Sequence, residues 1–376
     1  MRTLPRKEHP ARPTGARLLP FCVANFAFCL LPFAFLHATP LSSTATDEEI
    51  DASIERALEF IAAGQQDNGR FNSHLGRTVP GISGLCGMAF LAKGYMPGEG
   101  KYGEILNRCV DGVLNGADKN GYMSGEGRMY SHAICTLFLG EVSGNVDPER
   151  QKRIDLLLPR ATKIILNAQA VPKDNNQAGG WRYNPNSNDS DLSCSGWCLM
   201  ALRSANMNGA PVPQAAFDNA VKYILRRQHR EWGCFGYQGD SDYAKTLSGA
   251  AILCLALSGD FKRDPNIEPA IARGVRYLTY RQQNGSNVYR DLYKETRCFY
   301  GLYYTAQGLF QYGGAEWQQF ADWMYEWINH QQTDGSWDRG EEGCKYYQTA
   351  MVVLSFAVPY RQLPIYQRDE TVDVEE

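Results

Sequence analysis

The segment QQTDGSW at residues 331–337, two glutamines followed by a glycine and an aromatic residue, decides the fold of this chain. A closely similar segment, QQDNGRF, lies near the other end at residues 65–71. In such a turn, glycine supplies the left-handed conformation that ends a helix, glutamine can satisfy free carbonyl groups, and the aromatic ring packs against the next repeat. Two copies so far apart indicate an internal repeat.

Four shorter versions of this turn lie between the two, which makes six copies. An aromatic residue follows the glycine in each copy: Phe71, Tyr122, Trp181, Phe235, Tyr289 and Trp337. Successive aromatic residues are 51, 59, 54, 54 and 48 positions apart. This period is slightly longer than that of common helical repeats and is consistent with helix hairpins that carry an extra loop.

The two helices expected in each repeat differ in kind. Before the last turn, Phe320, Trp323 and Trp327 recur at helical spacing with polar residues opposite them, which predicts an amphipathic outer helix. Residues 247–257 are apolar on all sides, which is typical of an enclosed inner helix. We therefore predict an all-α fold, an alpha/alpha toroid of six helix hairpins with inner and outer rings. The beginnings of the inner helices would surround one central opening, and an open superhelix is the alternative.

The predicted toroid spans residues 50–360 as one domain, with a linker at 39–49 and an acidic C-terminal tail at 361–376. Residues 1–38 begin with five basic side chains and continue with an apolar run that ends at Ala38, the pattern of an export signal. Cleavage after Ala38 and retention as a membrane anchor both fit this pattern. We expect the protein to be exported, periplasmic or extracellular, and this segment could also associate it with a membrane.

Charge and cysteine usage narrow the function classes. The formal charge of the chain is −3, and removal of residues 1–38 would make it −7. Nucleic acid is therefore not an expected partner. Nine cysteines remain after residue 38, an odd number, and several lie inside apolar runs, as Cys254 does. Buried unpaired thiols are the better interpretation of such cysteines.

The repeated turns resemble the "QW" repeats of squalene-hopene cyclases, and resemble more closely the secreted prenyltransferase and squalene oxidase repeat proteins. The resemblance covers roughly residues 50–365. It rests mainly on GGWRY at 179–183 and WCLMAL at 197–202, with MYSH at 129–132 and the closing segment at 358–368. It implies the toroid fold. Because this fold carries cyclases, prenyltransferases, thioester domains and polysaccharide-active enzymes, it leaves the reaction open.

Two aspartates are candidates for acid chemistry. Class II terpene cyclases use a D-x-D-D motif whose central Asp donates a proton, and Asp189-Ser190-Asp191 supplies two of its three acids. Alignment by the following helix instead places Ser193 and Cys194 where the two adjacent acids belong. The competing interpretation is a polar loop in which Asp191 caps that helix.

His132 is a third catalytic candidate because it is the only histidine near the start of an inner helix. Its competing role is that of a buried histidine bonded to the backbone. Protein prenyltransferases resemble this chain in topology and use a zinc ion bound by Asp, Cys and His. Their D-x-C pairing is not matched around Asp191 and Cys194. We expect no metal and no other cofactor.

Aromatic and cationic residues gather around the predicted inner-helix beginnings. The candidates for substrate binding are Trp197, Tyr243, Arg297, Tyr300, Tyr304, Tyr346 and Tyr347. Aromatic faces can hold an isoprenoid tail, and their hydroxyls can equally bind sugars. Packing within the core or rim is the competing role for many of them.

The sequence predicts a protein that binds or transforms a hydrophobic, isoprenoid-like ligand in a central cavity. A non-catalytic binding scaffold and a polysaccharide-acting enzyme are the alternatives, and Asp240, Asp242 and Glu295 supply acids for the latter. The lining of the cavity discriminates among them. Apolar walls with one buried acid favour the first, a filled centre the second, and an open cleft with paired carboxylates the third.

Overall fold

The computed structural model describes residues 45–72, 78–241, 244–258, 265–340 and 343–367. The chain divides into two units, Met1–Pro40 and Leu41–Glu376, and all described residues belong to the second. These residues form helices and isolated bridges but no strand. The predicted signal or anchor at 1–38 lies outside the described residues. None of the described helices is long and apolar enough to cross a membrane.

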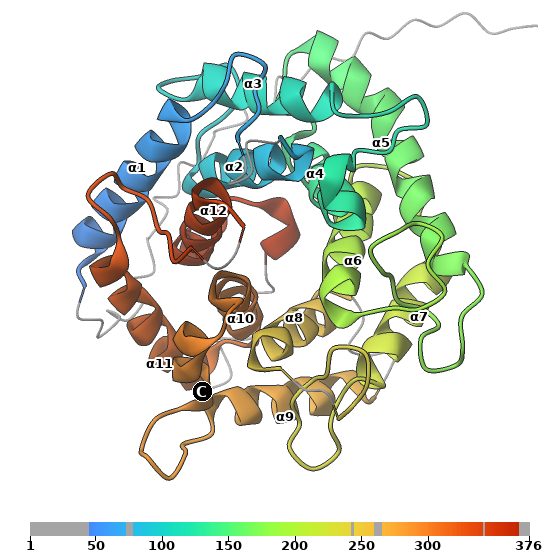
Figure 1. Cartoon of the computed structure of the whole chain (residues 1–376), viewed down its shortest axis with the longest axis vertical. Helices are drawn as coiled ribbons and strands as arrows, with labels where there is room; N and C mark the ends of the chain where they lie inside the picture. Colours follow the sequence, from blue (N-terminus) through green and yellow to red (C-terminus); the bar gives the residue numbers. More distant parts are fainter. Residues whose placement is uncertain (1–44, 73–77, 242–243, 259–264, 341–342, 368–376) are drawn as a thin grey trace, which may run out of the picture. The chain divides into compact units, whose positions relative to one another are not determined.

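The described residues form twelve α-helices that alternate between an outer and an inner ring (Figure 1). The outer helices are α1 (Asp47–Ala63), α3 (Gly103–Leu114), α5 (Pro148–Ala170), α7 (Gln214–Leu225), α9 (Ile267–Thr279) and α11 (Gly314–Tyr325). The inner helices are α2 (Pro80–Lys93), α4 (Arg128–Val142), α6 (Leu192–Met207), α8 (Lys245–Ala256), α10 (Cys298–Tyr312) and α12 (Lys345–Phe356). Short 3₁₀ helices occur at η1 (Gly125–Gly127), η2 (Val288–Lys294), η3 (Glu326–His330), η4 (Val358–Tyr360) and η5 (Pro364–Tyr366).

This arrangement confirms the predicted alpha/alpha toroid. The last inner helix, α12, packs against both α1 and α2, so the ring closes and the open superhelix is wrong (Figure 1). The two helix types behave as their patterns predict. Outer helix α9 buries one face, with Ile271, Val275 and Leu278, whereas inner helix α8 is buried almost along its whole length. Cys254 is fully buried in α8, and none of the nine described cysteines forms a disulfide.

In four of the described repeats, a glutamine side chain bonds to a carbonyl group of the next outer helix. The Gln331 side-chain amide donates to the carbonyl of Gly335 in its own turn and to that of Ser53 in α1, both at 2.9 Å. Gln228 and Gln169 make the corresponding pairs of bonds to α9 and α7. Gln331 thereby closes the ring between the sixth and first repeats. Glutamine therefore satisfies carbonyls of two repeats, in addition to the local role that the sequence indicates.

The structure shifts the repeat register in two turns. Counting from the left-handed glycine of each turn, the second residue after it is Phe71, Met123, Trp181, Phe235, Asn287 and Trp337. Met123, fully buried, therefore occupies the position predicted for Tyr122, and Tyr289 lies two residues beyond its expected place. The flexible, unbranched side chain of a methionine can fill a core position of this kind.

The packed chain extends beyond both predicted boundaries. Helix α1 begins at Asp47 because Thr46 and Glu49 form a reciprocal capping box with the backbone. At the other end, Ile365 and Tyr366 are buried, although the sequence predicts an acidic tail from residue 361. The Tyr366 hydroxyl bonds to that of Tyr303 in α10. Residues 368–376, which hold the acidic side chains, lie outside the described residues.

Candidate functional site

A shared hydrogen bond fixes the register in which four inner helices begin. In each case the donor is the backbone N–H of the second residue after the turn glycine, and the acceptor is a side chain in the inner helix that follows. The distance is 3.1 Å from Met123 to His132 Nδ1 and 2.9 Å from Trp181 to Ser195 Oγ. Ser248 accepts in the same way from Phe235, and Thr349 from Trp337, both at 3.1 Å. These four helices therefore begin at the same level relative to their turns.

The residue two positions earlier in each of these helices lines a cavity. These residues are Tyr130, Ser193, Thr246 and Tyr347, from α4, α6, α8 and α12. Helix α2 contributes Gly81 and Ile82 from its first turn, and α10 contributes Tyr300. The beginnings of all six inner helices therefore surround one opening, as the repeat predicts.

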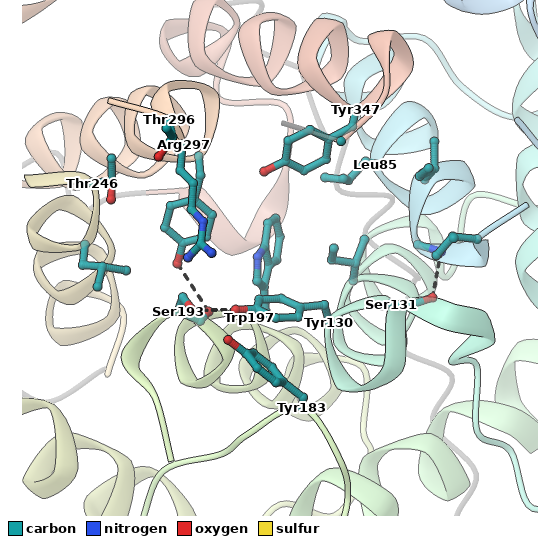
Figure 2. Close-up of a pocket in the computed structure, with 18 of the residues that line it drawn as sticks. Leu85, Tyr130, Ser131, Tyr183, Ser193, Trp197, Thr246, Thr296, Arg297 and Tyr347 are labelled. Atoms are coloured by element: carbon teal, nitrogen blue, oxygen red, sulfur yellow. Dashed lines mark hydrogen bonds between the residues drawn. The ribbon is translucent and has the colours of Figure 1, made fainter. Parts of the chain in front are cut away.

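The cavity has a volume of about 640 Å³ and is partly open to the outside. Its walls are mainly apolar and aromatic, with Leu85, Ile134, Trp197 and Leu247 among them. Figure 2 shows Tyr130, Trp197 and Tyr347 facing the same space from three different helices. This volume lies within the range of about 300–1,000 Å³ that is typical of small-molecule sites.

Asp191 is connected to the cavity through two hydroxyl groups. Ser193 donates to Asp191 Oδ1 at 2.5 Å, and the Tyr130 hydroxyl lies 2.5 Å from Ser193 Oγ. Asp191 itself is completely buried and does not line the cavity, whereas Ser193 and Tyr130 do (Figure 2). The carboxyl group also caps α6, because it accepts from the backbone N–H of Cys194 at 2.8 Å.

Burial dominates the electrostatics of this group. Removal from water raises the pKa of Asp191 above its ordinary value, although the bonds from Ser193 and Cys194 and the charge of Arg182 oppose the shift. The guanidinium of Arg182 lies 3.4 Å from Asp191 Oδ2 and 3.4 Å from Asp189. Burial likewise raises the pKa of the Tyr130 hydroxyl, and the nearby Asp191 carboxyl adds to the shift.

Four of the seven predicted substrate-binding residues line the cavity: Trp197, Arg297, Tyr300 and Tyr347. Tyr304 lies below the cavity wall and is completely buried, with its ring against Trp197 and Tyr300. Tyr346 points outward, where its ring stacks on Phe60 of α1 with 5.2 Å between centroids. Consecutive residues of a helix face different directions, so Tyr346 and Tyr347 cannot share the cavity. Tyr243 lies outside the described residues.

The position of His132 argues against the predicted catalytic role. Its Nδ1 accepts from the backbone of Met123, and its Nε2 lies 3.0 Å from the carbonyl oxygen of Ala161. Both ring nitrogens are therefore occupied, and the side chain is fully buried away from the cavity. Burial lowers its pKa to about 4, so the ring is neutral at ordinary pH. His132 serves as the repeat's turn acceptor, like Ser195.

Asp189, the other predicted catalytic acid, lies at the surface. Its side chain is 43% exposed and binds Arg182 and Gln238. It does not line the cavity. Asp189 and Asp191 both contact the guanidinium of Arg182. They are neighbours for this reason, and neither of them faces the position that a substrate in the cavity would occupy.

Sequence reasoning missed several lining residues, namely Tyr130, Ser131, Tyr183, Ser193, Tyr237, Thr246 and Thr296. Tyr130, Ser193 and Thr246 share one register, two residues before the turn acceptor, so an alignment of the inner helices on that acceptor would have found them. Tyr183 and Tyr237 come from loops. Their hydroxyls bond to one another, and Arg182 lies over both rings.

Residues suited to a metal ion do not come together in the described part of the chain. No group of three or more His, Cys, Asp or Glu side chains there could hold one. Cys194 instead donates to the Arg182 carbonyl at 3.2 Å, and burial raises the pKa of its thiol. Both ring nitrogens of His132 already have backbone partners, Met123 and Ala161 of the outer helix α5.

Solved structures with the same fold fall into two functional groups. The type II terpene cyclase MstE from Scytonema matches with a TM-score of 0.53 and 16% identity over 85% of this chain and all of that one. A variant of it in complex with the substrate geranylgeranyl dihydroxybenzoate matches with a TM-score of 0.52, at 15% identity over 82% and 97% of the two chains. An inactive variant of the α-1,6-mannanase GH76A of Salegentibacter sp. HEL1_6, in complex with α-1,6-mannotriose, gives 0.58 at 12% identity over 82% and 98%.

These likenesses establish the alpha/alpha toroid fold and nothing narrower, because the identities are low. The fold is shared by a terpene cyclase that binds an isoprenoid substrate and by a mannanase. Neither a protein-family model nor a curated protein sequence matches the chain. The choice between the two chemistries therefore depends on the cavity.

Proposed function

We propose that this protein binds a hydrophobic, isoprenoid-like ligand in the cavity at the inner-helix beginnings. The observation that carries the proposal is the lining of that cavity, which is mainly apolar and aromatic around about 640 Å³. An apolar chain gains free energy by leaving water for such walls, at about 25 cal/mol for each Å² of apolar surface buried. Trp197, Tyr130 and Tyr347 supply flat faces for its unsaturated groups.

The carboxylate content of the cavity weighs against the polysaccharide-acting alternative. Glycoside hydrolysis ordinarily uses two carboxyl groups that flank the bond to be cleaved. Among the described lining residues only Glu295 carries a carboxyl group, and Lys245 lies 3.4 Å from it. Asp240 is described and does not line the cavity, whereas Asp242 lies outside the described residues.

Direct protonation of the ligand by Asp191 is not supported by its position. Ser193 and Tyr130 lie between its carboxyl group and the cavity, so any proton exchanged with a ligand would pass through their hydroxyls. The network does provide an oriented hydroxyl group on Tyr130. We therefore propose ligand binding as the function and assign Asp191 a positioning role.

A cavity-filling variant tests this proposal. Ala244 lines the cavity near the start of α8, and an Ala244→Phe side chain would occupy part of its volume. We expect farnesol to bind the natural protein in equilibrium dialysis, and the variant to bind on the order of tenfold more weakly. Ala215→Phe, on the exposed side of α7, is the matched control and should bind as the natural protein does. Equal binding by all three proteins, or none, would remove the proposal.

Export is the second part of the proposal and rests on the sequence of residues 1–38 alone. N-terminal sequencing of protein from cell-envelope and soluble fractions tests it. A start at Thr39 indicates a cleaved signal, and an intact N-terminus in the membrane fraction indicates an anchor. Intact protein in the cytosol would contradict export.

A further inference from the structure

Arg297 is the charged group of the described cavity lining that lacks a partner. It lies at the N-cap of α10, its side chain is exposed, and it lines the cavity. No hydrogen bond or ion pair joins its side chain to another residue in the part of the chain that the structure describes. Figure 2 shows this side chain reaching from the α10 side toward Ser193. A guanidinium in this position offers a planar set of donors to an incoming group.

The other charged residue of the described lining is already compensated. Glu295 lies 3.4 Å from Lys245, and Asp291, the second acid near Lys245 at 3.2 Å, is also paired with Lys294 at 3.0 Å, so two lysines balance two acids. Within its described walls, the cavity therefore presents one unbalanced positive charge, that of Arg297. A negatively charged group of a ligand would neutralise the charge of Arg297, whereas a cationic ligand would be repelled.

The charged residues of the described cavity wall lie together around Arg297, and much of the remaining wall is apolar or aromatic. Thr296 and Glu295 lie beside Arg297 in the sequence and also line the cavity, whereas Leu85, Ile134 and Trp197 form apolar wall from α2, α4 and α6. A ligand with a charged end and an apolar chain would match both parts at once.

We infer that the ligand carries one anionic group, a carboxylate or a phosphate, which Arg297 binds while the apolar chain lies against Trp197. This inference rests on the proposed function and specifies the class of ligand. A guanidinium binds either anion through two parallel N–H bonds, which orients the ligand as well as holding it. Arg297 would thereby fix which end of the chain enters the cavity.

Matched probes separate the contributions of charge and chain. Farnesoic acid and farnesol share the isoprenoid chain and differ at one end, and farnesyl monophosphate carries the other anion. Acetate is an anion without the chain. At neutral pH the carboxylic acid is ionised. We expect the natural protein to bind both anionic probes on the order of tenfold more tightly than farnesol, and to bind acetate undetectably.

Variants of Arg297 then test the assignment. Arg297→Gln should bring the affinity ratio of acid to alcohol close to one, and Arg297→Lys should restore part of it because the charge returns without the planar fork. Arg230→Gln, at an exposed arginine outside the cavity, is the matched control and should retain the full ratio. Added salt should reduce the ratio in the natural protein.

The failures of the two proposals can be told apart. If farnesol and the acid bind equally well, or if Arg297→Gln keeps the ratio, the anionic group is contradicted and the isoprenoid site remains. Preference for the alcohol would contradict it as well. If no isoprenoid probe binds the natural protein, the proposed function fails and this inference fails with it.

Discussion

Asp191 combines two roles that a sequence treats as alternatives. It caps α6 through the N–H of Cys194, and it is also a buried acid whose pKa is raised. Ser193 transmits its position to Tyr130 in the cavity. The capping role could be predicted from the polar residues before an apolar helix. The contact with Tyr130 could not, because it joins two helices whose relative depth is set by the turns.

Replacement of Asp191 by Asn or by Ala separates these roles. The side-chain oxygen of an asparagine could still accept from Cys194, so we expect Asp191→Asn to change stability little, whereas Asp191→Ala should cost about 1–2 kcal/mol through loss of the cap. Because the pKa is raised in the fold, the acid stabilises the native state below its unfolded pKa of about 3.9, and this contribution is lost as pH rises through the folded pKa. Thermal melting from acidic to neutral pH should show that loss in the natural protein and not in Asp191→Asn. Equal destabilisation by both substitutions would contradict the capping role.

At the scale of the element, the Gln-Gly turn joins neighbouring repeats. Gly335 has a φ of 88°, and a Cβ atom there would lie 2.3 Å from the carbonyl oxygen of Arg56 in α1. Its glycine is therefore required twice, by the backbone conformation and by the close approach of the next helix. The sequence predicts the first requirement from the turn, whereas the second depends on ring closure.

The two requirements can be measured apart with Gly335→Ala and Gly340→Ala. Gly340 also has a positive φ, 70°, but a Cβ there would meet no atom within 4 Å. We expect Gly340→Ala to cost about 1 kcal/mol from backbone strain alone, and Gly335→Ala to cost more than about 2 kcal/mol because α1 must also move. Urea denaturation of both variants supplies the comparison. Similar losses would show that the contact between the sixth and first repeats is loose.

The inner helices show how far a repeat pattern predicts a site. Their apolar composition places them in the inner ring, and the repeat places their beginnings at one opening. The side chains that face the opening are those two residues before the inner-helix side chain that accepts a hydrogen bond from the turn, such as His132. The structure is needed to identify these acceptors. Tyr346 and Tyr347 are consecutive in the sequence, yet Tyr346 packs against the outer helix α1 and Tyr347 lines the cavity. An error of one residue in the register would exchange these two roles.

At the scale of the whole molecule, the C-terminal segment closes the toroid opposite the cavity. Tyr366 bonds to Tyr303, whose ring stacks on Trp197 of the cavity wall, 5.5 Å between centroids. The backbone N–H of Ile365 donates to Glu141 Oε2, near the end of α4, at 3.1 Å. The sequence does not indicate this closure, because residues 361–367 show neither the repeat nor a helical period.

Glu141 makes the closure sensitive to pH. Burial raises its pKa to about 7, from 4.5, so the protonated form is favoured in the fold. Stability from this group is full below about pH 4.5 and is lost as pH rises toward 7, by an amount on the order of 3 kcal/mol. A Glu141→Gln variant keeps an acceptor for Ile365 and a partner for Ser204. Its melting temperature should therefore fall less between these pH values, and an unchanged pH profile would contradict the role of Glu141.

Native mass spectrometry of the protein purified from the cells that produce it tests the central claim, an isoprenoid-like ligand in the cavity, most directly. The account predicts an additional mass that gentle activation releases and that fragments as an isoprenoid chain with one acidic group. Ala244→Phe, purified in parallel, should carry little or none of it, and Ala215→Phe should carry the full amount. A released oligosaccharide, or a lipid retained equally by the cavity-filled variant, would contradict the account.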